Sequence, residues 1–177
     1  LAGKADWHAR ISAVLDAIAR LTPAPAFVLH SGDLMEEPSP DCAQAFRDLF
    51  ARCPYPLQVL PGNHDVWNAP VSGPDLPWWT RPTSAGDEQR YSSWLGPAAY
   101  SFIQERCAFV TLNTQSLNTS LPEAAVQWTW LEGELARLAA QQPLHLIVCG
   151  HMPLCIRSVD EPFNLADWRQ AYMVVAP

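Results

Sequence analysis

Two short apolar segments, residues 27–30 and 57–60, constrain the fold of this chain more than any other feature of its sequence. Each has the length and composition of a buried strand, and the stretch between them carries a helix pattern that begins near Ser39-Pro40. A strand, a helix and a second strand within about 30 residues give the length that a right-handed parallel crossover needs. The two segments are therefore predicted to be neighbours in one parallel sheet, with their carboxyl ends at the same edge.

Three predicted strands run directly into polar residues. Asp33 follows the first strand, Asn63, His64 and Asp65 follow the second, and His151 follows a third apolar run. Taken singly, two of the clusters have a plain structural explanation: a Pro-Gly turn in the second and a structural histidine in the third. Ligands in open α/β sheets bind at the carboxyl ends of strands. Three such clusters in one chain favour a functional site.

The side chains of these clusters suit a metal centre. Asp33, Asn63 and His151 are an oxygen, oxygen and nitrogen ligand set for a divalent cation such as Mn, Fe or Zn. A carboxylate can also bridge two cations, as two-metal phosphoesterases require. His64 is a candidate to protonate a leaving oxygen, and Asp65 to hold the His64 imidazole in the correct tautomer.

Periodicity and turn residues predict further elements along the chain. A long helix that starts at residue 122 is expected to open with a capping box at Ser120-Leu121-Pro122-Glu123. In chain order these elements are a helix over 6–21, a hairpin of strands 100–103 and 107–112, a helix from 122, a buried strand over 144–149 and a strand over 172–175.

Residues 66–93 are rich in proline and glycine and are predicted to form a long loop. Loops of this length usually carry function or move. The tryptophans in and beside it, Trp67 among them, either form a wall of a substrate site or pack a satellite cluster. Arg81 and Arg90 either clamp an anionic substrate or are simply solvated.

Composition excludes several classes of protein. The 177 residues carry a net charge of −7, which argues against a duplex nucleic-acid binder because such proteins need a basic face. No apolar run approaches the roughly 18 residues of a membrane span. The five cysteines form no Cys-x-x-Cys pair, and Cys107 and Cys149 lie in strand-like runs as small buried hydrophobes. We therefore expect a reducing, cytoplasmic compartment.

The order and spacing of these clusters resemble a known family. Gly32-Asp33, Gly62-Asn63-His64-Asp65 and the strand followed by His151-x-Pro153 are similar to the motifs of the calcineurin-like metallophosphoesterase superfamily. Further segments resemble its branch related to serine/threonine phosphatases: Leu112-Asn113-Thr114-Gln115, Gln127-x-x-Trp130-Leu131, the stretch from Asp160 to Leu165, and Asn68-x-Pro70.

The resemblance implies a fold and a set of roles. It implies an α/β protein, an αββα sandwich of two stacked mixed sheets flanked by helices, with a dinuclear centre of Mn, Fe or Zn between strand-end loops. Asp33 would bridge the two metals, while Asn63 and His151 would bind the second. His64 would be the acid or the substrate-orienting group, supported by Asp65. Trp67, Asn68, Arg81 and Arg90 are the candidate substrate-binding residues.

Two motifs of that superfamily are absent from the sequence, an early Asp-x-His type and a late Gly-His-x-His. We therefore expect residues 1–177 to be one calcineurin-like domain that lacks its first strand and a segment near 170–171. The expected activity is metal-dependent hydrolysis of a phosphomonoester or phosphodiester, in a phosphoprotein or a small molecule, by attack of metal-bound hydroxide. The alternative is an inactive relative that binds a partner through residues 66–94. A nuclease of the same fold is disfavoured by the acidic charge.

Overall fold

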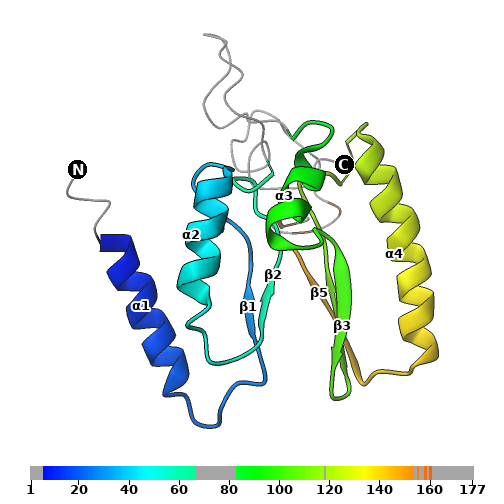
Figure 1. Ribbon diagram of the computed structural model, residues 1–177. Coiled ribbons are helices and arrows are strands. Elements are labelled where there is room, and N and C mark those ends of the chain that lie inside the picture. Colours follow the sequence, from blue (N-terminus) through cyan, green and yellow to red (C-terminus); the bar gives the residue numbers. More distant parts are fainter. Residues whose placement is uncertain are drawn as a thin grey trace.

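A computed structural model of the chain describes residues 6–66, 83–117, 119–153, 155, 158 and 160 (Figure 1). None of the helices in these residues combines the length and the apolar character that a membrane span requires. In chain order the elements are α1 (Asp6–Ala19), β1 (Val28–His30), α2 (Pro40–Phe50), β2 (Leu57–Val59), α3 (Asp87–Leu95), β3 (Tyr100–Gln104), β4 (Cys107–Thr111), α4 (Pro122–Ala140) and β5 (His145–Cys149).

The first sheet is the predicted parallel crossover. Strands β1 and β2 pair in parallel, with Val28 opposite Leu57, and α2 connects them. Helix α2 begins as the sequence indicates, because the Ser39 hydroxyl accepts a hydrogen bond from the Cys42 N–H and Pro40 occupies the first turn. The prediction that β1 and β2 end at the same edge is confirmed.

The second sheet has the order β3-β4-β5 in the described residues. Strands β3 and β4 form the predicted antiparallel hairpin, and Glu105 in its turn takes a left-handed φ of 55°. Strand β5 then pairs in parallel with β4, and α4 makes the crossover. Leu131 and Leu138 of α4 pack on Ala108 and Val110 of β4, which fixes the helix on the outer face of this sheet.

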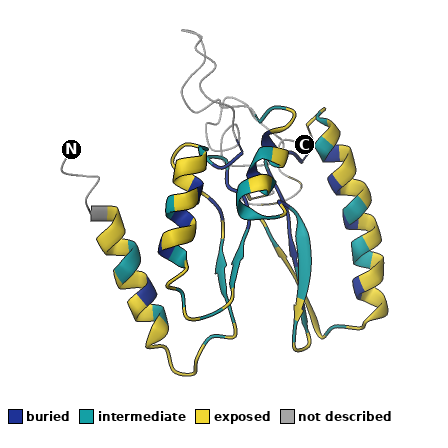
Figure 2. Ribbon diagram, in the orientation of Figure 1, coloured by how far each residue is buried: buried dark blue, intermediate teal, exposed yellow. Residues whose placement is uncertain are grey.

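The two sheets face each other. The Phe27 ring stands edge-on to Phe102 and to Phe109, with ring centroids 5.1 Å apart in each pair. The Tyr100 hydroxyl donates to the Val59 carbonyl oxygen at 2.8 Å, which joins β3 to β2. With α1 and α2 on one side and α4 on the other, the layers are those of an αββα sandwich (Figure 1). The outward sides of the helices are exposed (Figure 2).

Part of the predicted long loop is a helix. Residues 66–93 were expected to be irregular, but Asp87–Leu95 form α3. The Asp87 carboxylate accepts from the Ser84 N–H, and Gly86 takes the left-handed conformation just before the helix. Tyr91 faces inward against Val66, so tertiary packing stabilises a helix whose sequence shows only a weak apolar stripe.

Two smaller expectations are also wrong. The N-cap of α4 is Leu121, which makes no side-chain cap, and the Glu123 carboxylate instead accepts from the Gly86 N–H at 2.8 Å. A partner on another element thus replaces the predicted capping box. Strand β5 is exposed at four of its five residues instead of buried, because in the described part of the chain it pairs only with β4. Cys107 and Cys149 are half-buried, and all five cysteines are free.

Candidate metal centre

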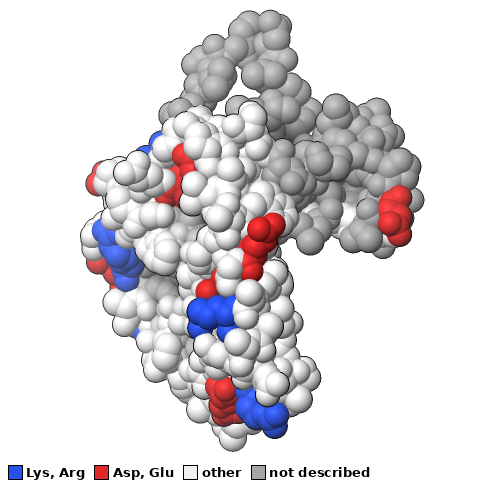
Figure 3. Space-filling view, turned by 90° about the vertical axis from the view of Figure 1, so that its right-hand side faces the viewer, with Lys and Arg blue, Asp and Glu red and all other residues white. Residues whose placement is uncertain are grey.

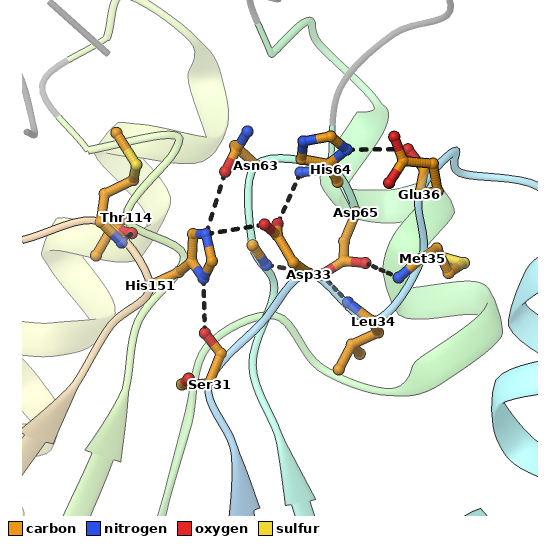
Figure 4. A network of polar contacts seen from close by, with 12 residues as sticks. Ser31, Asp33, Leu34, Met35, Glu36, Asn63, His64, Asp65, Thr114 and His151 are labelled. Atoms are coloured by element: carbon orange, nitrogen blue, oxygen red, sulfur yellow. Dashed lines mark hydrogen bonds and ion pairs between the residues drawn. The ribbon is translucent and has the colours of Figure 1, made fainter. Parts of the chain in front are cut away.

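The loops that follow β1, β2 and β5 meet at one point (Figure 4). Two glycines allow this approach. A Cβ atom on Gly32 would lie 2.6 Å from the Gly62 nitrogen and 2.7 Å from His151 Nδ1. A Cβ on Gly62 would overlap the Asp33 carboxylate. Only glycine fits at these positions, and Gly32 also has a φ of 100°.

Asp33 is the centre of the cluster. It has a left-handed φ of 55°, rare for a residue with a side chain, and this conformation turns its carboxylate toward the other two loops. Oδ1 accepts from the His64 N–H at 3.1 Å, and Oδ2 lies 3.4 Å from His151 Nε2. Burial works against ionisation, but hydrogen bonds from His151 and His64 hold the pKa of Asp33 below its usual value.

His151 is oriented by a backbone carbonyl. Its Nδ1 lies 2.7 Å from the Ser31 oxygen, and its Nε2 lies 3.1 Å from Asn63 Oδ1. Because a carbonyl oxygen only accepts, Nδ1 must carry a proton, and Nε2 then faces two oxygen acceptors, on Asn63 and Asp33. The hydrogen bond with Asp33 is the main reason that the pKa of His151 is raised. His151 Nε2 thus faces the oxygens of both Asn63 and Asp33.

The three donors fit a divalent cation. Asp33, Asn63 and His151 present a carboxylate oxygen, an amide oxygen and an imidazole nitrogen to one point, as predicted from the sequence. A histidine whose Nδ1–H donates to a carbonyl is also the usual arrangement of a metal ligand. Over the described residues, no group of three or more His, Cys, Asp or Glu side chains is placed to hold a metal ion. That the amide of Asn63 supplies the third donor stays a prediction.

Asp65 has a different role from the predicted one. It was expected to hold the His64 imidazole, but its fully buried carboxylate accepts from three backbone N–H groups, those of Gly62 at 2.8 Å, Met35 at 3.0 Å and Leu34 at 3.1 Å. Burial raises the pKa of Asp65 to about 6. The side chain therefore ties the β2 loop to the β1 loop instead of orienting a histidine.

The His64 ring is held by the chain that follows β1. Its Nδ1 lies 3.0 Å from the Glu36 carbonyl oxygen, so in the neutral ring Nδ1 carries the proton (Figure 4). This leaves Nε2 as the ring atom for acid–base chemistry. No sequence pattern marks the Ser31 and Glu36 carbonyls that orient the two histidines, because any residue offers a carbonyl.

The fourth strand-end loop, after β4, was not predicted to take part. Thr114 accepts a hydrogen bond through its hydroxyl from the Met152 N–H at 2.9 Å, next to His151. The run of polar residues Asn113-Thr114-Gln115 at the end of β4 is the signal that could have indicated this contact.

Of the four candidate substrate-binding residues, the structure describes one. Trp67, Asn68 and Arg81 lie outside the described residues, as do the strand predicted at 172–175 and the segment near 170–171. Arg90 lies on α3, where it forms an ion pair with Asp87 at 2.9 Å and stacks over the Trp94 ring. Its role as an anion clamp stays a prediction.

On the face that α4 covers, described acidic and basic side chains are interspersed (Figure 3).

Comparison with known proteins gives a consistent result. The calcineurin-like phosphoesterase family model matches residues 5–173. The chain is 29% identical over 181 residues to serine/threonine-protein phosphatase CPPED1 of Rattus norvegicus, covering 92% of this chain and 53% of that protein. It is 29% identical over 185 residues to the Homo sapiens protein of that name, covering 93% and 54%. For the Danio rerio protein the identity is 32% over 180 residues, covering 92% and 54%.

The chain spans about half the length of the curated relatives it matches. The family match nevertheless includes all three loops that meet at Asp33, Asn63 and His151. Members of the matched family generally use divalent metal ions. By its sequence and its layered fold, this chain belongs to the calcineurin-like phosphoesterase family.

Proposed function

We propose that this chain carries part of the active site of a metal-dependent phosphoesterase that hydrolyses a phosphomonoester or phosphodiester. The observation that carries the proposal is the convergence of Asp33, Asn63 and His151 from three strand ends on one point. The three side chains lie at a partly exposed meeting point of loops and not in a hydrophobic core. In a phosphoesterase they would hold a cation of the Mn, Fe or Zn type.

The residues divide the work. Divalent cations at such sites lower the pKa of water and neutralise charge that develops on the phosphoryl group. Asp33 would contact more than one cation through its two carboxylate oxygens, while Asn63 and His151 would bind one. Asp65 keeps the loops of Asp33 and Asn63 at a fixed separation through its backbone hydrogen bonds.

His64 is proposed to donate the Nε2 proton of its protonated ring to the leaving oxygen. Its Nδ1 lies against the Glu36 carbonyl, and its backbone N–H donates to Asp33, so one ring nitrogen and the backbone of His64 are both held. General acids of this kind contribute about 10²–10⁴-fold to rate. The substrate is proposed to be a phosphoserine or phosphothreonine residue of a protein, because the relatives are named serine/threonine-protein phosphatases.

Metal content and hydrolysis in the whole-length protein test the proposal together. Asp33→Asn keeps the shape of the side chain but removes its charge, and we expect it to lose bound Mn, Fe or Zn and phosphatase activity. Asp48→Asn, the same change on the exposed side of α2, is the matched control and should keep both. Full hydrolysis by metal-free wild-type protein would overturn the proposal, as would a wild-type protein that takes up no metal.

The role of His64 is tested by leaving groups. His64→Gln should slow hydrolysis of a phosphoserine peptide by about 10²–10⁴-fold, because an alkoxide needs a proton as it departs. An aryl phosphate with an acidic phenol leaves without that proton, so its kcat should change far less. Equal losses for the two substrates would show that His64 positions the substrate instead.

A further inference from the structure

Thr114 holds the chain on both sides of His151. Its hydroxyl accepts from the Met152 N–H at 2.9 Å, one residue after the histidine. Its methyl fills the space beside Gly150, one residue before it: a Cβ added to Gly150 would lie 2.5 Å from Thr114 Cγ2, and no other atom would be closer than 3.8 Å. One buried side chain thus sets the position of both neighbours of a candidate ligand.

Thr114 is itself held by helix α4. The Gln127 amide accepts from the Asn113 N–H at 2.8 Å and donates to the Asn113 carbonyl at 3.0 Å, so it pairs with the backbone as a neighbouring strand would. The same Nε2 donates to the Ser116 hydroxyl at 3.2 Å. Asn113, Ser116 and Gln127 are all almost fully buried. The loop after β4 is therefore held in place by α4, independently of its contacts with the residues beside His151.

The contacts of the His151 ring require such a support. Its Nδ1 must reach the Ser31 carbonyl while its Nε2 points at Asn63 and Asp33, and these partners belong to the other sheet's loops. The contacts of the ring with Ser31, Asn63 and Asp33 fix the orientation of the ring but not the position of the His151 backbone. The position of the His151 backbone is set by its neighbours Gly150 and Met152, the two residues that Thr114 contacts.

We propose that Thr114 is a positioning residue of the metal centre, which acts through Gly150 and Met152 to place His151, and that Gln127 keeps Thr114 in place. The proposal rests on the proposed function in one respect, that His151 is a metal ligand. Residues that orient a metal ligand typically change metal affinity by about 10–100-fold when they are substituted.

A pair of variants of the whole-length protein separates the two halves of the side chain. Thr114→Val keeps the shape and both branches but removes the acceptor for the Met152 N–H. Thr114→Ser keeps the hydroxyl and removes the methyl. Titration of metal-free protein with Mn²⁺ should show an affinity about 10–100-fold weaker in T114V, with a smaller loss in T114S. Thermal unfolding of the metal-free proteins shows whether both variants are folded.

Gly150 provides the second test. Gly150→Ala alone should weaken Mn²⁺ binding, because its methyl meets Thr114 Cγ2. The double variant T114S/G150A removes that methyl from one side and adds it on the other, so affinity should return close to that of T114S. Additive losses in the double variant would contradict the proposal, as would unchanged Mn²⁺ affinity in T114V.

The two proposals fail in different ways. If the wild-type protein binds no Mn²⁺, Zn²⁺ or Fe²⁺, the proposed function fails, and the NMR signals of the His151 ring in metal-free protein then test the position of the histidine. T114V and G150A should shift those signals, and T114S/G150A should restore them toward T114S. Signals that stay fixed in all variants would overturn the positioning role of Thr114.

Discussion

The two sides of the candidate site are fixed by different chemistry. On the β1–β2 side, the loops of Asp33 and Asn63 are joined by one charged group, the Asp65 carboxylate, which accepts from backbone N–H groups of both loops. On the β4–β5 side, the loop of His151 rests on neutral groups, the Thr114 hydroxyl and the Gln127 amide.

This difference predicts different tolerance to mutation. Hydrogen bonds to an ionised acceptor are roughly twice as strong as neutral ones. The Asp65 side should therefore behave as part of the folding core, where a substitution unfolds the protein. The Thr114 side should be adjustable, since a change there alters the metal site while the chain stays folded. The following predictions test this contrast, from the largest expected effect to the smallest.

Asp65→Ala is expected to have the largest effect. It leaves three N–H groups in two loops without their acceptor, and each lost buried partner costs about 1–3 kcal/mol. We expect the free energy of unfolding to fall by about 3–5 kcal/mol in denaturant titrations. A loss below about 1 kcal/mol would mean that water replaces the carboxylate, and the contrast between the two sides would disappear.

Gln127→Met should have an intermediate effect. Methionine keeps the length of the side chain but cannot pair with the Asn113 backbone, so one N–H and one carbonyl lose a buried partner. A loss of about 2–3 kcal/mol is expected by urea unfolding. Gln44→Met, on the exposed face of α2, is the control and should change stability by less than about 0.5 kcal/mol. Equal losses in the two variants would contradict the network.

Tyr91→Phe should stabilise the protein. The Tyr91 side chain is fully buried between the β2 loop and α3, and its hydroxyl has no hydrogen-bond partner among the described residues. Removing a buried polar group without a partner should raise the free energy of unfolding by about 1 kcal/mol or more. A clear loss of stability by differential scanning calorimetry would show that the hydroxyl has a partner, such as an ordered water.

Glu134→Gln should have the smallest effect and a defined pH dependence. Hydrogen bonds from Arg137 and Ser101 lower the pKa of Glu134 to about 2. A lowered pKa gives stability that is present above the ordinary value of 4.5 and is lost as the pH falls toward 2. The stability difference between wild type and E134Q should therefore be below about 1 kcal/mol near neutral pH and vanish in acid. A difference that grows in acid would have the wrong sign.

The sequence predicts the meeting of Asp33, Asn63 and His151 better than the contacts around them. Asp33 and Asn63 were found because the carboxyl ends of β1 and β2 meet at one edge of a parallel sheet, and His151 because it too follows a strand end, in the other sheet. The role of Asp65 could not be found in this way. Its partners are backbone N–H groups of Leu34 and Met35, about 30 residues away, and a backbone group leaves no mark on the sequence.

Helix α3 and the cap of α4 were missed for a related reason. Gly86 and Glu123 both occur in local patterns that suggest a loop and a capping box, yet in the fold they bond to each other. The exposure of β5 also depends on pairing and not on composition, since its apolar run is equally compatible with a central strand or an edge strand. The local sequence thus predicts whether a segment is a helix or a strand. Its exact ends and its burial depend on contacts with residues that are distant in the sequence.

The most direct test of the central claim is a crystal structure of the whole-length protein grown with Mn²⁺, with the cation located by its anomalous scattering. We predict a peak in contact with Asp33 Oδ2, Asn63 Oδ1 and His151 Nε2, and a His151 ring that still donates through Nδ1 to Ser31. A peak bound only by other residues, with His151 Nε2 still hydrogen-bonded to Asn63, would contradict the account.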